Sequence, residues 1–196
     1  DLPARPAMGR EDFLVAPCNQ DAVGWIDRWP EWPSPCLVLH GPAGSGKTHL
    51  ARVWQQRSAA VWGEGAALDQ YFRHANEGGA LCLDLNGEVP DETALFHLFN
   101  RARERGGWLL LTGRGPVRDW GIALPDLRSR LMAAPSVAVA APDDALLAAV
   151  TVKLFADRQL AVTPDLLNYM LTRVDRSFAA LGEAIDRLDR AALAEK

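Results

Sequence analysis

Short apolar runs alternate with helix-like segments over the first two thirds of the chain. The runs lie at residues 36–40, 59–62, 80–85, 108–112 and 137–140, and their lengths are typical of strands buried on both faces. Segments with apolar positions at helical spacing lie between them, at residues 20–29, 47–57, 68–75, 91–105 and 124–132. Asn19 is predicted to cap the first of these helices. The alternation predicts an α/β fold with a parallel sheet sandwiched by helices.

After Pro142 the pattern changes, because no further strand-like run occurs. Residues 143–159, 164–173 and 177–194 all show helical periodicity, and the last segment carries one continuous apolar stripe. We therefore predict an extended N-terminal leader over residues 1–18, an α/β core over 19–141 and a small helical lid over 142–196.

Composition narrows the classes of function. The formal net charge is −4, whereas a protein that wraps nucleic acid concentrates Lys and Arg, so we expect no specific DNA binding. The three cysteines form no CxxC pair, which predicts reduced thiols in a cytoplasmic protein. No apolar run reaches the 18 residues or so of a membrane span, so we expect no membrane partner.

The strongest motif follows the run at 36–40 and precedes the helix at 47–57. It has the form G-x-x-x-x-G-K-[ST] of a P-loop, and its residues are Gly41, Pro42, Ala43, Gly44, Ser45, Gly46, Lys47 and Thr48. In such a loop the backbone N–H groups and the helix N-terminus hold phosphates. The lysine supplies a cation to the phosphates, and the hydroxyl supplies an oxygen to Mg²⁺. The motif therefore makes the core a nucleotide-binding unit for ADP or ATP with Mg²⁺.

Two further strand ends carry polar side chains. Asp84 closes the run at 80–85 as the acidic residue of a Walker B strand does, and with Thr48 it is our predicted Mg²⁺ ligand. Leu85 follows it, where many P-loop ATPases have a second carboxylate that orients water, so we expect slow hydrolysis. Thr112 ends the run at 108–112. Its hydroxyl either contacts the γ-phosphate or bonds to its own turn.

Arginines and tryptophans leave alternatives open. Arg130 and Arg176 are candidates for stabilising charge during phosphoryl transfer, and the alternative for each is an exposed, salt-bridged helix residue.

Seven tryptophans are scattered through apolar patterns. They are better explained by core packing than by a platform for stacking bases.

Several segments together resemble the DnaA/Hda family of AAA+ ATPases of bacterial replication initiation, and closest is the Hda type. The similar segments are residues 11–13 with 19–20, the Gly-Lys-Thr-His-Leu of residues 46–50, and residues 96–100, 126–131, 175–176 and 188–191. The resemblance covers essentially the whole chain. It implies nucleotide contacts from Leu14, Asn19 and His49, an arginine finger at Arg130 and a sensor arginine at Arg176.

What the resemblance implies is a regulator that, with the DNA polymerase III sliding clamp, stimulates ATP hydrolysis by DnaA. In this family the clamp is held by an N-terminal motif of the form QLxLPL, which this chain does not contain; Leu2-Pro3 would follow it. The chain ends at Lys196, soon after the predicted lid, which favours the Hda type. The alternatives are the isolated AAA+ core of a DnaA initiator and an ATPase of the helicase-loader type. A homo-oligomer is a further expectation.

Overall fold

The computed structural model describes residues 13–65, 67–86, 88–89 and 91–194. The predictions that rest on residues 1–12 lie outside the described residues. These are most of the leader, the start of the family-like segment at 11–13 and the place of Leu2-Pro3 after a clamp motif.

A five-stranded sheet forms the centre of the molecule, as the apolar runs predict. Its strands lie in the order β2-β3-β4-β1-β5, and every adjacent pair is parallel. The strands are β1 (Cys36–His40), β2 (Val61–Glu64), β3 (Ala80–Asp84), β4 (Trp108–Gly113) and β5 (Ser136–Ala138). Because all five run the same way, their carboxyl ends meet at one edge of the sheet, which is where ligand sites of parallel sheets form.

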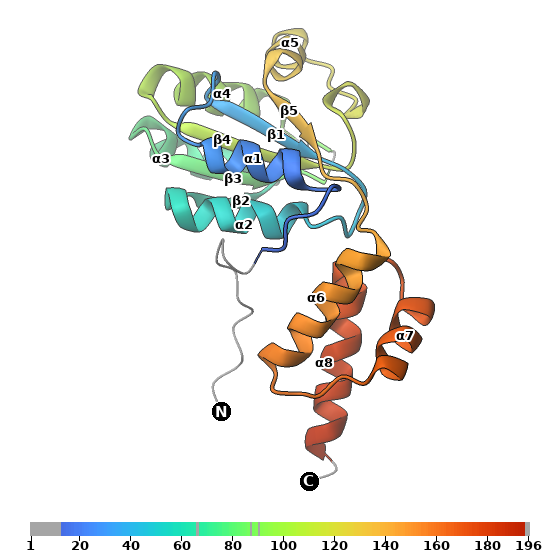
Figure 1. Ribbon diagram of the computed structural model, residues 1–196. Coiled ribbons are helices and arrows are strands. Elements are labelled where there is room, and N and C mark those ends of the chain that lie inside the picture. The colour runs from blue at the N-terminus through green and yellow to red at the C-terminus, as the bar shows by residue number, and fades with distance from the viewer. Residues whose placement is uncertain (1–12, 66, 87, 90, 195–196) are drawn as a thin grey trace.

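Helices cover both faces of this sheet (Figure 1). One apolar cluster joins Leu37 and Leu39 of β1 to α1 (Gln20–Arg28) and α2 (Lys47–Ser58). A second cluster joins Val38 of β1 to the helices of the opposite face, which are α3 (Phe72–Asn76), α4 (Glu92–Arg105) and α5 (Pro125–Ala133). Successive side chains of a strand point to opposite faces, so a continuous apolar run serves both clusters. The predicted α/β sandwich is confirmed.

Three helices follow β5, as the sequence predicts: α6 (Asp144–Asp157), α7 (Pro164–Arg173) and α8 (Phe178–Ala194). They form an apolar cluster of their own around Phe155, Met170 and Ile185. An ion pair between Arg158 and Asp186 also ties the end of α6 to α8. In Figure 1 these helices form a separate group at one end of the sandwich. The division of the chain at residue 141 stays a prediction.

Two local predictions are wrong, and one short element was missed. The second strand begins at Val61 rather than at residue 59, because Ala59 has a φ of 53° and ends α2 in the left-handed conformation. The helix expected at 68–75 is split into the 3₁₀ turn η2 (Leu68–Tyr71) and the short helix α3. A further 3₁₀ turn, η3 (Val117–Asp119), was not predicted.

The tryptophans pack mainly in the core, as predicted. Trp32 stacks on Trp54 with ring centroids 5.4 Å apart, and Trp108 meets Trp32 edge-on at 5.7 Å. Trp29 contacts both Trp54 and Trp108. This cluster lies with α1 and α2 on one face of the sheet. One pair of its rings is stacked and the others meet edge-on, so these tryptophans pack against one another.

Candidate functional site

The P-loop lies between β1 and α2, as its sequence context requires. Its first glycine is held to the neighbouring strand, because Gly41 N donates a hydrogen bond of 3.2 Å to Gly113 O at the end of β4. Gly44 and Gly46 have φ angles of 73° and 96°, values that residues with a Cβ rarely adopt. These two glycines let the loop curl back over the start of α2.

The N-terminus of α2 is free of a side-chain cap. Gly46 is the N-cap residue and offers no side-chain oxygen to the first-turn N–H groups. Such N–H groups, with the positive end of the helix dipole, form an anion site. Lys47 lies inside the loop, where its Nζ donates hydrogen bonds to Pro42 O at 2.6 Å and to Ser45 Oγ at 3.4 Å. The loop therefore fits a phosphate chain.

Asp84 joins the ends of three elements. Thr48 of α2 donates to its Oδ2 at 3.3 Å, and Thr112 of β4 donates to its Oδ1 at 2.8 Å. Thr112 thus bonds to Asp84 rather than to its own turn, and its contact with a γ-phosphate stays a prediction. Carboxylate and hydroxyl oxygens are the donors that Mg²⁺ prefers. The pair of Thr48 and Asp84 therefore fits the predicted metal site.

Burial and neighbouring charges shift the pKa values of two side chains at the site. Burial lowers the pKa of Lys47; the carboxylate of Asp84 opposes this shift, and the positive charge of Arg114 adds to it. Burial also lowers the pKa of His40, at the end of β1, and the charges of Lys47 and Arg118 lower it further. A bound polyanion would offset this repulsion. Sequence reasoning missed His40 and Arg114, although both lie next to predicted site residues.

Asp91 and Leu85 bear on the missing second acid. Leu85 is buried in the apolar cluster beneath α4. Asp91 caps α4, since its Oδ1 accepts a hydrogen bond of 2.8 Å from Ala94 N. Glu88 is exposed. Glu88 and Asp91 are the next two carboxylates after Asp84 in the sequence, and Asp91 already has a structural role as a helix cap. The residue directly after Asp84 is Leu85, which carries no carboxylate.

The segment before α1 lies against the first turn of α2. The ring centroids of Phe13 and His49 are 5.3 Å apart, so the residue before Leu14 contacts the predicted nucleotide contact His49. Asn19 occupies the N-cap position of α1, as predicted. Its side chain accepts from Ala16 N at 2.9 Å and donates to Leu14 O at 3.0 Å, and it makes no cap bond to α1. The amide is used to fold the preceding turn, so Asn19 shapes the segment that carries Leu14.

The start of α8 touches the P-loop. Phe178 N donates to Gly44 O at 3.3 Å, and Ser177 Oγ caps the helix through Ala180 N. Arg176 therefore lies just before α8 rather than within it. Its guanidinium pairs with Asp144 of α6. The backbone of Arg176 thus lies near the P-loop, and its side chain makes the ion pair that we expected of an exposed, salt-bridged residue.

Arg130 lies on the other side of the sheet from α2. It belongs to α5, and its guanidinium lies 5.0 Å from the ring centroid of Phe96 and 5.9 Å from that of Phe99, both on α4. These cation–π contacts orient the side chain. The structure does not bring Arg130 together with the P-loop residues, and its role as a finger stays a prediction.

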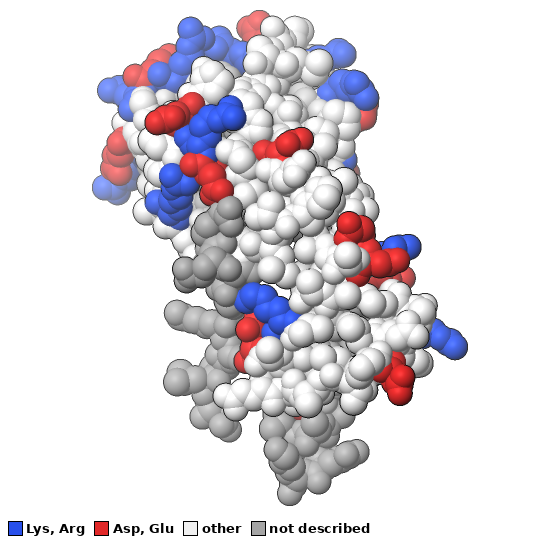
Figure 2. All heavy atoms as spheres, viewed as in Figure 1, with Lys and Arg blue, Asp and Glu red and all other residues white. Residues whose placement is uncertain are grey.

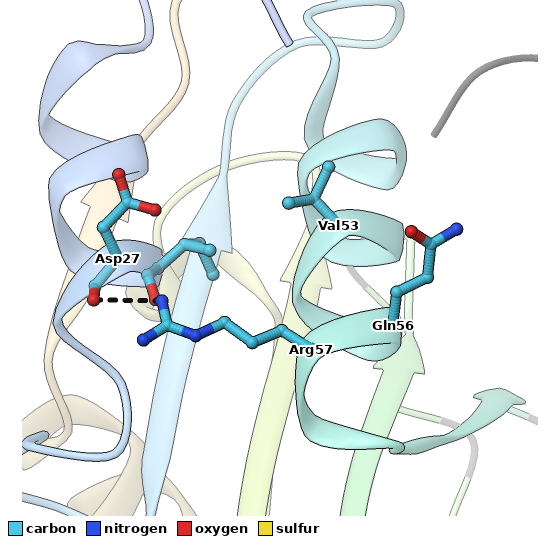
Figure 3. A pocket seen from close by; sticks show the side chains of 5 residues that line it. Asp27, Val53, Gln56 and Arg57 are labelled. Atoms are coloured by element: carbon cyan, nitrogen blue, oxygen red, sulfur yellow. Dashed lines mark hydrogen bonds between the residues drawn. The ribbon is translucent and has the colours of Figure 1, made fainter. Parts of the chain in front are cut away.

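A hollow of about 310 Å³ between α1 and α2 is lined by Ile26, Asp27, Val53, Gln56 and Arg57 (Figure 3). It lies at the C-terminal half of α2, away from the P-loop. Arg57 crosses it to donate to Asp27 O at 3.0 Å and to Trp29 O at 2.8 Å. Cations stabilise the C-terminal carbonyls of helices, so Arg57 ties α1 to α2.

Charge and topology bear on the expected partners. On the face shown in Figure 2, Lys and Arg are interspersed with Asp and Glu and form no continuous basic band. Among the described residues, no helix is long and apolar enough to cross a membrane. Cys18, Cys36 and Cys82 are all free thiols.

Solved structures show the same fold. Domain III of the replication initiation protein DnaA from Thermotoga maritima has a TM-score of 0.80 at 18% identity, over all of this chain and 93% of that one. A DNA replication initiation factor has a TM-score of 0.78 at 16% identity, over 94% of this chain; the chain spans only 64% of that structure. AMPPCP-bound DnaA from Aquifex aeolicus has a TM-score of 0.75 at 16% identity, over 91% of this chain and 63% of that one. At these identities the likeness establishes the fold, which is a AAA+ core like that of DnaA domain III with helices at the C-terminus.

Sequence comparison gives the family. No family model matches the chain. An uncharacterised protein of Haemophilus influenzae is 31% identical over an alignment of 175 residues, and the alignment covers 81% of this chain and 75% of that protein. The chain therefore belongs to the same family as this Haemophilus influenzae protein, and it has the AAA+ fold seen in domain III of DnaA.

Proposed function

We propose that this chain is a nucleotide-binding protein of chromosome replication initiation that takes ADP or ATP with Mg²⁺ at the P-loop. The observation that carries this proposal is the meeting of Thr48, Asp84 and Thr112 beside Lys47, at an uncapped helix N-terminus. The N–H groups of the loop and Lys47 would hold the phosphates, and Thr48 and Asp84 would hold the metal. Mg²⁺ supplies charge neutralisation there when it is bound.

Two features support a place in replication initiation. The fold is that of DnaA domain III, and one of the similar structures is DnaA bound to AMPPCP. The positive charges of Lys47 and Arg114 suit a nucleotide with several phosphates. We propose that Leu14 and His49 contact the base or ribose; the ring contact between Phe13 and His49, which joins the segment of Leu14 to α2, supports this.

Replacing the P-loop lysine tests nucleotide binding. Lys47→Ala removes the ammonium from the phosphates and should weaken ADP and ATP binding by roughly tenfold or more, because hydrogen bonds to charged groups contribute about 1.5–3 kcal/mol. Titration calorimetry gives the affinities. Lys153→Ala is the matched control, since this lysine lies on α6 and pairs with Asp157. Equal affinities in Lys47→Ala and the parent would refute the site.

The finer role that we propose is regulation of DnaA, with the sliding clamp and DnaA as partners. The chain's own site has no carboxylate directly after Asp84, and Asp91 is used as a helix cap, so hydrolysis by the chain itself should be slow. Arg130 is oriented by two rings on the side of the sheet away from α2. A guanidinium in this position would act on a nucleotide held by a neighbouring DnaA.

Arg130→Ala tests this role. An arginine finger contributes roughly 10³–10⁵ in rate, so the variant should lose stimulation of DnaA. The measurement is phosphate release from ATP-bound DnaA with full-length protein and DNA-loaded clamp. Arg128→Ala is measured beside it, because Arg128 is an exposed arginine on the same helix and the next candidate for the finger. Full stimulation by Arg130→Ala, with thermal melting confirming that it folds, would remove Arg130 from the role.

A further inference from the structure

The first residue of α8 joins the C-terminal helices to the P-loop. Phe178 begins α8, and its backbone N–H donates a hydrogen bond of 3.3 Å to Gly44 O. Its ring packs against the apolar cluster of the C-terminal helices, and a Cβ on Gly46 would lie 3.1 Å from the same ring. The backbone and the side chain of one residue therefore hold α8 against the two glycines that let the P-loop curl.

The bond from Phe178 sets the direction of one peptide group in the P-loop. In a planar trans peptide the C=O and the N–H point in opposite directions. Because Gly44 O points toward α8, the N–H of Ser45 points away from α8 and toward the inside of the loop. There it donates to Pro42 O at 3.4 Å, and Ser45 itself is buried.

Two donors converge inside the loop. Lys47 Nζ donates to Pro42 O at 2.6 Å, and Ser45 N donates to the same oxygen at 3.4 Å. Most N–H···O bonds are 2.7–3.2 Å long, so the bond from Ser45 is a weak one. A negatively charged phosphate oxygen is a stronger acceptor than a carbonyl. The N–H of Ser45 is therefore directed inward and has only a weak acceptor to give up.

Glycine makes this peptide depend on an outside restraint. Gly44 has no Cβ and a φ of 73°, so its own side chain does not restrict rotation of the peptide between Gly44 and Ser45. The hydrogen bond from Phe178 supplies that restriction from α8. Ser177 supports it, because a Cβ on Gly44 would lie 2.2 Å from Ser177 Cβ, which shows how closely the two segments approach.

We propose that the backbone N–H of Phe178 positions the phosphate cradle: by holding Gly44 O outward, it keeps the N–H of Ser45 turned toward a bound phosphate. This inference rests on the proposed nucleotide site. In this role Phe178 does not touch the nucleotide and acts through the peptide between Gly44 and Ser45. Coupling of this kind is reciprocal, so a phosphate that engages Ser45 also stabilises the contact of α8 with the loop.

Two substitutions at one position separate the N–H from the ring. Phe178→Pro removes the N–H and the ring, whereas Phe178→Ala removes the ring alone. Proline suits the first position of a helix, and α7 of this chain already begins with Pro164. Ser177, whose Oγ accepts from Ala180 N, remains as the cap of α8.

The affinity for ADP with Mg²⁺ is measured by titration calorimetry, and Tm is measured without nucleotide. Phe178→Pro should weaken ADP binding about tenfold, which is the scale of a hydrogen bond to a charged group, and Phe178→Ala should stay within about threefold of the parent. Both variants should lower Tm to a similar extent, because both lose the ring. A merely structural role of Phe178 would instead make the loss of affinity follow the loss of Tm in both variants.

A measurement on the parent chain needs no substitution. ADP should slow hydrogen exchange of the Phe178 amide by about threefold or more, because the coupling is reciprocal. The amide of Leu166 is the control. It lies in the first turn of α7, where it donates to Thr163 Oγ at 3.3 Å, and ADP should leave its exchange unchanged. Amide exchange is followed residue by residue by NMR.

Several results would overturn the inference. If Phe178→Ala and Phe178→Pro weaken ADP equally, the ring and not the N–H supports the loop. If neither weakens it, or if ADP does not slow exchange at Phe178, the bond to Gly44 O does not position the cradle. These outcomes leave the nucleotide site standing, whereas a parent chain that does not bind ADP refutes that site and this inference together.

Discussion

Thr112 offers a sharp test of the link between the sheet and the candidate metal site. Its side chain is fully buried, and its hydroxyl donates to Asp84 Oδ1 at 2.8 Å. Thr112→Val keeps the shape of the side chain and removes only the donor. Asp84 then keeps the bonds from Thr48 at 3.3 Å and from Asn86 N at 3.4 Å, both of which are longer.

The expected cost follows from the charge of the acceptor. A hydrogen bond to a carboxylate contributes about 1.5–3 kcal/mol, and the added methyl group offsets up to about 0.8 kcal/mol. The net loss should therefore be about 1–2 kcal/mol. For a chain of this length that lowers Tm by roughly 2–8 °C. A carboxylate that is no longer held by Thr112 should also hold Mg²⁺ less well.

Thr151 provides a matched control within the same chain. It is also a fully buried threonine, but its hydroxyl donates to Leu147 O at 2.7 Å inside α6. Leu147 O belongs to the helix and keeps its backbone partner, so Thr151→Val loses only a neutral hydrogen bond. The burial of the added methyl group offsets most of that loss, so the variant should lose about 0.5 kcal/mol of stability or less.

The assay is nucleotide binding with Mg²⁺ and with EDTA, together with thermal melting. In the parent, Mg²⁺ should strengthen ATP binding. Thr112→Val should reduce this Mg²⁺-dependent gain several-fold and leave binding in EDTA nearly unchanged, whereas Thr151→Val should leave both unchanged. If Thr112→Val keeps the full Mg²⁺-dependent gain, or if Thr151→Val loses it too, the hydroxyl of Thr112 does not position a metal ligand.

Two further predictions follow from the electrostatics and packing of the P-loop. Because burial, Lys47 and Arg118 lower the pKa of His40 below its ordinary 6.5, the unfolded chain binds this proton at higher pH than the folded chain does. The stability that His40 contributes is therefore full above pH 6.5 and is lost as the pH falls below it. The free energy of unfolding, measured with urea at about pH 7.5 and about pH 5.5, should fall less between the two pH values in His40→Gln than in the parent. An equal fall in both proteins would contradict the lowered pKa. Gly44→Ala should destabilise the fold by about 1–3 kcal/mol, because Gly44 has a φ of 73° and its Cβ would lie 2.2 Å from Ser177 Cβ. Adding Ser177→Gly should restore part of the Tm measured by calorimetry, and no recovery would show that the contact between α8 and the P-loop is not what limits this position.

The sequence by itself determined most of the fold. The runs that form β1, β3 and β4 are apolar up to their carboxyl ends, because strands of a covered parallel sheet are buried on both faces. The P-loop motif needs only local spacing, and it places Lys47 and Thr48 at the start of α2 whatever the rest of the chain does. The second strand was misplaced for a local reason: Ala59 takes a left-handed conformation that nothing in its residue type signals.

Only the tertiary structure decided which side chains meet. Thr112 and Asp84 are 28 residues apart, and their contact depends on β3 and β4 being neighbours, which periodicity does not encode. The side-chain amide of Asn19 could either cap α1 or bond to the preceding turn. In the structure it donates to Leu14 O and makes no cap bond to α1. Arg114 and His40 became site residues because the sheet order brings β4 beside β1. Hydrophobic pattern determines which segments are buried, whereas polar contacts depend on angles and distances of a few tenths of an ångström that arise only when all the strands and helices are packed together.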